Sequence, residues 1–145
     1  MYCTEDTERY LISKELLNKM REEIKNWFKQ AEADLKSARN CLSSEDFYLS
    51  VFSSQQSVEK ALKSLCLLKI KEIPKGHSII YLAQKVNLPK EFFSGIRDLN
   101  PEYLTTRYPD LAEGVPAELY DKEIAERHYN TAEKVIKWVK LQIQK

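Results

Sequence analysis

Two histidines are the side chains of this 145-residue sequence best suited to proton transfer near neutral pH, because imidazole titrates at about pH 6.5. His128 occupies the i+4 step between Ile124 and Ala132, so we expect it to face the core of a helical protein or the edge of that core. It is either a packed histidine with one hydrogen bond or a partly buried imidazole with a shifted pKa, as acid–base chemistry would need. Arg127 lies roughly 100° round the same helix turn and could line the same groove.

His77 follows Lys75 and Gly76 just before, or at, the start of a predicted helix. It either caps that helix and anchors the loop, or lies on the rim of a polar pocket. Neither His77 nor His128 belongs to an H-x-x-x-H or H-E-x-x-H motif, so we expect no metal site. The three glycines form no phosphate-binding loop, and no G-x-S-x-G motif is present. We therefore expect no cofactor.

The segment 105–116 interrupts a chain that otherwise has helical periodicity, and it contains Arg107-Tyr108-Pro109-Asp110. The planar guanidinium of Arg107 suits a carboxylate or a phosphate. Pro109 favours an extended backbone at Tyr108, and Asp110 could cap or turn the next segment. The group either clamps a helix end or a partner carboxylate, with Tyr108 packed over the arginine, or forms an anion- or nucleotide-binding corner.

Lys60 is a further candidate for contact with an anion, on a predicted helix that also carries Glu59 and Lys63. Glu59 and Lys63 are spaced i,i+4, a pair that stabilises a helix by only about 0.2–0.5 kcal/mol. A solvated helix face is the simplest interpretation of this cluster.

Apolar residues recur at steps of three and four along most of the chain, which predicts helices. The predicted helices run from Ser13 or earlier to Leu42, from a cap at Ser43 or Ser44 to about Lys71, from Ser78 to Val86, from Pro89 to Leu99, and from Tyr120 to Ile143. Three long and two short helices around one core predict an all-α fold, an antiparallel bundle.

The charge balance and the cysteines limit the classes of function. With 23 basic and 22 acidic residues the net charge is +1, so a general attraction to nucleic acid or to a membrane is not implied. No apolar run is long enough to span a bilayer. The odd number of cysteines and the absence of C-x-x-C spacing indicate reduced thiols, Cys41 and Cys66 being buried, and a cytoplasmic protein.

The sequence resembles the HEPN domain family (higher eukaryotes and prokaryotes nucleotide-binding), in particular its small stand-alone prokaryotic members. The resemblance covers roughly residues 25–143, so we expect an N-terminal helical extension over 1–22 and the domain over 23–145. It is carried by the order and spacing of five short segments, namely 27–35, 55–63, Gly76-His77-Ser78, Arg107-Tyr108-Pro109-Asp110 and the last helix with Trp138-Val139.

The resemblance implies an up-and-down bundle of four to five helices, usually a homodimer, and in many members a pairing with a minimal nucleotidyltransferase in a system of toxin–antitoxin type. Active members are metal-independent ribonucleases with an R-x(4–6)-H motif, and in some a tyrosine just after that histidine is nucleotidylated. Here lysines, Lys122 and Lys71, stand six residues before His128 and His77, and Tyr129 follows His128 directly. A lysine keeps the charge but loses the two-pronged contact with phosphate.

Three hypotheses follow. The first is a module that binds a nucleotide, a nucleic acid or a nucleotidyltransferase partner without full ribonuclease activity, through a polar groove near Arg107, Tyr108, Asp110 and His128. The second is a ribonuclease toxin in which His128 is the acid–base group and Lys122 or Arg127 supplies positive charge. The third is a helical scaffold that only dimerises.

Overall fold

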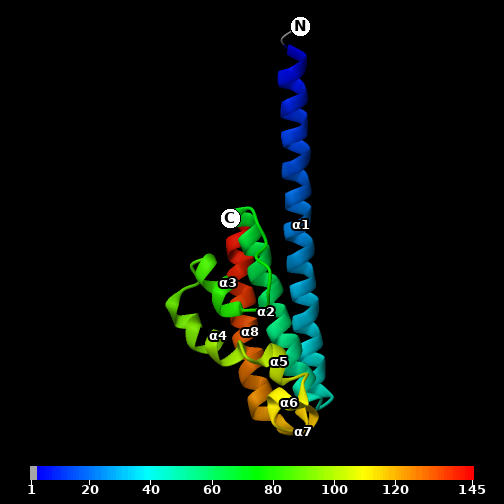
Figure 1. Cartoon of the computed structure of the whole chain (residues 1–145), viewed down its shortest axis with the longest axis vertical. Coiled ribbons are helices and arrows are strands. Elements are labelled where there is room, and N and C mark those ends of the chain that lie inside the picture. Colours follow the sequence, from blue (N-terminus) through cyan, green and yellow to red (C-terminus); the bar gives the residue numbers. More distant parts are fainter. Residues whose placement is uncertain (1–2) are drawn as a thin grey trace.

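Three long helices form the body of the protein, which the computed structural model describes over residues 3–145 (Figure 1). They are α1 (Cys3–Ser43), α2 (Phe47–Ile70) and α8 (Lys122–Gln144), and each packs against the other two. α1 runs antiparallel to both α2 and α8 (Figure 1). Residues 3–145 contain no strand, so the prediction of an all-α antiparallel bundle is confirmed.

A tight turn joins α1 to α2, and it corrects the predicted cap. Ser43 is the last residue of α1, and Asp46, not Ser43 or Ser44, occupies the N-cap position of α2. The Ser44 hydroxyl contacts the Cys41 carbonyl oxygen and a carboxylate oxygen of Asp46, at 3.3 and 2.8 Å. The hydroxyl therefore stabilises the end of α1 and the turn, and leaves the amides of α2 without a side-chain cap.

Short helices connect α2 to α8 along one side of the bundle. Ser78 is the N-cap of α3 (Ile79–Lys85), and its hydroxyl accepts a hydrogen bond from the amide of Tyr81, as expected for a residue at a helix start. The predicted helix from Pro89 to Leu99 divides into a single 3-10 turn, η1 (Lys90–Phe92), and α4 (Phe93–Leu99). Three one-turn helices follow, namely α5 (Glu102–Thr105), α6 (Pro109–Ala112) and α7 (Pro116–Leu119).

Pro109 explains the local geometry of the segment 105–116. It occupies the first position of α6, where its missing N–H costs no helical hydrogen bond. Tyr108, directly before it, has the extended backbone that a following proline favours, with φ −119° and ψ 113°. The segment therefore contains one complete one-turn helix, α6, between the last residue of α5 and the first residue of α7, and Asp110 lies in the first turn of α6.

The core lies where α2 is enclosed by α1, α8 and α3. Leu62 and Leu65 of α2 and Val135 of α8 are among its fully buried side chains. Small side chains let α1 and α2 approach closely, since the buried Ser50 hydroxyl donates to the Ala38 carbonyl oxygen at 2.8 Å. Both Cys41 and Cys66 are free thiols, and burial raises the pKa of Cys66 to about 11.

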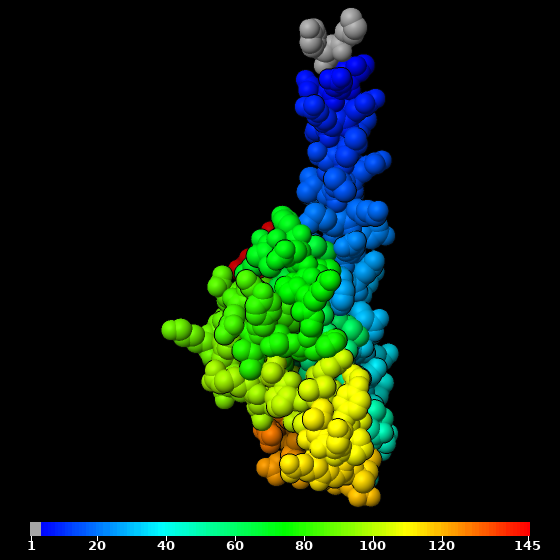
Figure 2. Space-filling view, in the orientation of Figure 1, coloured from blue at the N-terminus to red at the C-terminus, as the bar shows by residue number. Residues whose placement is uncertain are grey.

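α1 is one continuous helix whose N-terminal half extends beyond the rest of the bundle (Figures 1 and 2). The side chains of residues 4–19 are exposed, and the first buried one among the described residues is Ile24. Residues 1–2 of the predicted extension lie outside the described residues. In the described part of the chain no helix is both long and apolar enough to cross a membrane.

Candidate functional site

The side chain of His128, on α8, is enclosed beside α4 and α5. Asp121 is the N-cap of α8, and its carboxylate accepts a hydrogen bond from the amide N–H of Ile124 at 2.8 Å; His128 therefore lies in the second turn of α8. The side chain is 1% exposed. Its Nδ1 lies 3.7 Å from Oδ2 of Asp98, and its Nε2 lies 3.9 Å from Oε1 of Glu102. Both distances exceed hydrogen-bonding range, so the imidazole lies between two carboxylates without bonding to either.

Each of these carboxylates has its own partner. Arg127 donates to Asp98 through Nε at 2.8 Å and through Nη2 at 3.3 Å, a two-pronged pair that lowers the pKa of Asp98 and raises that of Arg127. Glu102 accepts hydrogen bonds from the hydroxyl groups of Thr105 and Tyr120. Burial and the bond to Glu102 raise the pKa of Tyr120. Other side chains thus hold Asp98 and Glu102 in place, and neither carboxylate fixes the His128 ring by a hydrogen bond.

Burial lowers the pKa of His128, and this effect outweighs the two carboxylates, which act in the opposite direction. The imidazole is therefore neutral at neutral pH. A phosphate group cannot reach it within one chain, because the side chain is almost fully enclosed and two acids surround it. His128 is a buried polar residue in this chain, not an accessible acid–base group.

The pH dependence of stability should report this burial. Because the pKa of His128 is lower in the folded protein than in the unfolded chain, unfolding takes up a proton. The contribution to the free energy of unfolding is complete above pH about 6.5 and declines below it, by up to about 1.4 kcal/mol per pH unit. Urea titrations between pH 7.5 and 5.5 should show this slope in the wild type and in His77→Gln, but not in His128→Gln. Equal slopes in all three would contradict the assignment.

A second cluster surrounds His77 on the loop between α2 and α3. Nδ1 of His77 lies 3.0 Å from Oε1 of Glu59, and Lys63 approaches the other oxygen of Glu59 at 3.3 Å. The side-chain amide of Gln55 donates to the His77 carbonyl oxygen at 3.3 Å. Glu59 and Lys63 are 4% and 7% exposed, whereas the side chain of His77 is 48% exposed. A buried charge pair of α2 therefore fixes an accessible imidazole.

Aromatic rings connect His77 to Arg107. The ring of Tyr103, on α5, stacks on His77 with centroids 3.9 Å apart and an angle of 16° between the planes. The Arg107 guanidinium carbon lies 4.6 Å from the centroid of Tyr103, 5.0 Å from that of Tyr108 and 5.5 Å from that of Phe52. Its Nη2 donates to the Tyr108 hydroxyl at 2.7 Å. We call His77, Tyr103, Arg107, Tyr108 and Phe52 the aromatic–arginine platform.

The structure separates the predicted site residues into groups. His77, Arg107 and Tyr108 meet in the platform, whereas His128 and Arg127 belong to the buried cluster with Asp98 and Glu102. In residues 3–145 no hydrogen bond or ion pair joins Arg107 to His128.

The remaining two predicted residues lie apart from these clusters. Asp110 is exposed in the first turn of α6, and Lys60 pairs with Asp34 of α1 at 2.6 Å. The structure adds Tyr103, Phe52, Asp98 and Glu102. Tyr103 precedes Arg107 by four residues, but α5 ends at Thr105, so the two do not share a helix and the sequence holds no clear signal for Tyr103.

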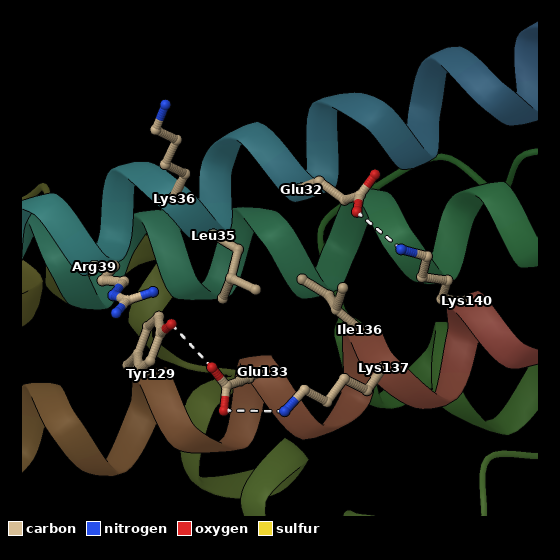
Figure 3. A pocket seen from close by; sticks show the side chains of 9 residues that line it. All are labelled: Glu32, Leu35, Lys36, Arg39, Tyr129, Glu133, Ile136, Lys137 and Lys140. Carbon is tan, nitrogen blue, oxygen red and sulfur yellow. Dashed lines mark hydrogen bonds and ion pairs between the residues drawn. The ribbon is translucent and has the colours of Figure 1, made fainter.

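A groove of about 350 Å³ lies between α1 and α8 (Figure 3). Its acids are already engaged: Glu133 accepts the Tyr129 hydroxyl at 3.0 Å and pairs with Lys137 at 3.5 Å, and Glu32 lies 3.8 Å from Lys140. Burial and the bond to Glu133 raise the pKa of Tyr129. None of the predicted site residues lines this groove. Across residues 3–145 no group of three or more potential ligands could hold a metal ion.

These features define a class: small all-α bundles with a buried histidine on the last helix and a polar surface beside the one-turn helices. The HEPN domain family matches the chain over residues 24–142, and the chain belongs to this family. The match begins just where α1 enters the bundle.

Relatives with solved structures share the fold. TT1696 from Thermus thermophilus is 31% identical, with a TM-score of 0.76 over 81% of this chain and 96% of its own. ST0689, an archaeal HEPN homologue, is 38% identical, with a TM-score of 0.74 over 83% and 98% of the two chains. Among curated proteins, one of Methanocaldococcus jannaschii named "Putative toxin MJ1304" is 32% identical over 80% of this chain and 85% of its own.

Proposed function

We propose that this HEPN protein is a nucleotide- or nucleic-acid-binding module of a toxin–antitoxin pair, with a minimal nucleotidyltransferase as partner and without full ribonuclease activity. One observation carries the proposal: the aromatic–arginine platform exposes His77, Arg107 and Tyr108, whereas His128 is enclosed. The name of the Methanocaldococcus jannaschii relative, "Putative toxin MJ1304", supports the toxin–antitoxin setting.

The chemistry of the platform suits a nucleotide. Aromatic faces stack on bases without strong sequence preference, at about 1–3 kcal/mol per base. The Arg107 guanidinium presents several N–H donors to phosphate oxygens, and its position over Tyr103 holds it beside the stacking surface. Tyr108 is 40% exposed and would provide a further face. A base stacked on the rings would thus bring its phosphate towards Arg107.

The geometry disfavours RNA cleavage by His128. Lys122, which occupies the position of the arginine in the nuclease motif, is 75% exposed and pairs with Glu126 at 3.8 Å. Arg127 is engaged by Asp98. The positive charges that would have to hold a scissile phosphate are therefore paired with other side chains, and the charged groups that face the two ring nitrogens of His128 are carboxylates.

Replacing Arg107 by alanine should weaken binding of ATP or of a short single-stranded RNA at least about tenfold, because the phosphate loses a charge-assisted contact. Isothermal titration calorimetry measures this, with Arg97→Ala as matched control, since Arg97 is an exposed arginine of α4 away from the platform. A wild type that binds neither ligand, or an equal loss in both variants, would contradict the proposal.

The partner and the absence of cleavage need separate tests. A nucleotidyltransferase encoded beside this protein should co-purify with it, and a neighbouring enzyme that does not bind would refute that half of the proposal. Purified protein should leave a generic RNA intact. Cleavage that disappears in His128→Ala would instead establish the ribonuclease alternative.

A further inference from the structure

A long groove follows the seam between α1 and α8. The hollow drawn in Figure 3, of about 350 Å³, continues into a second one of about 370 Å³, because Glu32 and Lys140 line both. On α1 the two hollows extend from Lys25 to Arg39, which is about 21 Å of helix at 1.5 Å per residue. We call them together the α1–α8 groove, and no residue of the aromatic–arginine platform lines it.

The floor of the α1–α8 groove is apolar. Leu35 and Ile136 point toward one another between the two helices (Figure 3), and Phe28 and Ile143 line the second hollow. Leu35 and Ile143 pack against the core but are only partly buried. Part of the apolar seam is therefore accessible at the bottom of the groove, and a ligand with an apolar side would remove it from water.

The rim of the groove on α1 is a row of cations. It consists of Lys25, Lys29, Lys36 and Arg39, all exposed, and in residues 3–145 none of these four side chains makes an ion pair. Arg39 is directed toward Tyr129, and Lys36 points away from α8 at the outer edge (Figure 3). Steps of three, four and seven residues place all four along one side of the helix. An anionic partner would relieve the repulsion between these like charges.

The two acids that line the groove do not cancel this row. Glu133 pairs with Lys137 at 3.5 Å and Glu32 lies 3.8 Å from Lys140, so each has a cation of its own. Six basic and two acidic residues line the groove, whereas the whole chain has 23 and 22. The groove is thus distinctly positive on a nearly neutral chain. The acids one turn beyond its ends are Glu22 and Glu126.

We propose that the α1–α8 groove binds an acidic amphipathic helix of a different protein. A helix of about fourteen residues matches the length of the groove, and the seam between two packed helices suits a third one. Its apolar side would cover Leu35 and Ile136, and carboxylates at steps of three and four would face the cation row on α1. This goes beyond the nucleotide-binding proposal and does not depend on it, because the platform is a separate surface.

The groove suits a nucleic acid less well, although its rim is basic. A charged backbone gains nothing from an apolar floor, and single strands bind through exposed aromatic faces on which their bases stack. The aromatic rings that line the groove are those of Phe28, which is 8% exposed, and of Tyr129, which is partly buried and whose hydroxyl donates to Glu133. The combination of an apolar floor with a cationic rim favours the acidic helix.

Fluorescence anisotropy with two designed peptides tests the match. The first is a fluorescein-labelled helix of about sixteen residues, with leucines along one face and glutamates beside them. The second has the same composition, but its leucines are spread round the helix. The full-length protein should bind the first peptide saturably and the second at least about tenfold more weakly, because only the first can bury its leucines on the floor. Absence of binding, or equal affinity for both peptides, would overturn the proposal.

Charge reversal on α1 locates the binding surface. Lys29→Glu combined with Arg39→Glu should weaken binding of the first peptide at least about tenfold. The control, Arg9→Glu combined with Lys14→Glu, reverses the same two residue types on the exposed part of the same helix and should leave the affinity unchanged. Equal losses in the two double variants would show attraction to the whole helix and overturn the assignment. Thermal unfolding checks that both remain folded.

A short single-stranded RNA separates this proposal from the nucleotide-binding one. If the RNA binds at the platform, Arg107→Ala should weaken it and the reversal at Lys29 and Arg39 should have less than about a threefold effect. RNA binding that the reversal abolishes and that Arg107→Ala leaves intact would assign the groove to nucleic acid, and would overturn the acidic-helix proposal.

Discussion

Glu59→Ala should lower the free energy of unfolding by about 3–5 kcal/mol, because it leaves a buried ammonium without its counter-ion. Glu59 and Lys63 are 4% and 7% exposed, and Oε2 of Glu59 lies 3.3 Å from Nζ of Lys63. The Trp27 ring, 5.7 Å from the same nitrogen, offers only a weak alternative. The substitution also removes the carboxylate that holds His77 at 3.0 Å, so the platform should bind nucleotide less tightly. Urea denaturation followed by circular dichroism gives the stability.

A surface pair and a double variant serve as controls for this prediction. Glu133→Ala also removes the acid of an i,i+4 pair with a lysine, but that lysine is 75% exposed, so the loss should stay below about 1 kcal/mol. Glu59→Gln combined with Lys63→Met should recover most of the stability, because no unpaired charge remains buried. Equal losses in Glu59→Ala and Glu133→Ala would show that the buried pair contributes no more than a surface pair.

The main helices were predictable because their apolar spacing directly reflects burial. The stripes through Ile24, Phe28 and Ala31 in α1 and through Val135 and Val139 in α8 are buried as expected. The details at the helix ends were less predictable. Several polar residues could cap α2, and the choice of Asp46 depends on the turn, in which Glu45 adopts a left-handed backbone with φ 63°. The single 3-10 turn before α4 does not change the spacing of the apolar residues, so the sequence pattern could not reveal it.

Individual residues of the candidate site could be named from the sequence, but their grouping in space could not. Arg107 and His77 were both named as candidates, yet thirty positions separate them, and only the packing of α5 beside α2 brings them together. Two consecutive side chains of α5 belong to different clusters: Glu102 faces His128, and Tyr103 faces His77. A segment of one turn has no periodicity from which this division could be inferred. Arg107 therefore lies with His77, not with His128 as its position in the sequence indicated.

The geometry of the buried cluster depends on the contact between α4 and α8, and one glycine permits it. A Cβ on Gly95 would lie 2.7 Å from Cγ2 and 2.8 Å from Oγ1 of Thr131, closer than atoms approach in folded proteins. Thr131 cannot easily move away, because its β-branched side chain is stiff in a helix and its hydroxyl donates to the Arg127 carbonyl oxygen at 3.2 Å. α4 in turn carries Asp98, the partner of Arg127.

Gly95→Val should therefore lower the free energy of unfolding by about 3 kcal/mol through overpacking, although valine adds apolar surface. Because α4 must shift away from α8, Asp98 should release Arg127 in part, and its pKa should rise towards the ordinary value, which NMR titration of the Asp98 carboxyl can follow. Gly114→Ala is the control: its Cβ would meet the flexible end of Leu119 at 3.2 Å and should cost less than about 1 kcal/mol. Adding Thr131→Ala to Gly95→Val should restore both stability and the low pKa. If the free energy of unfolding falls while the pKa of Asp98 stays the same, the α4–α8 contact stabilises the bundle but does not position Asp98 beside His128.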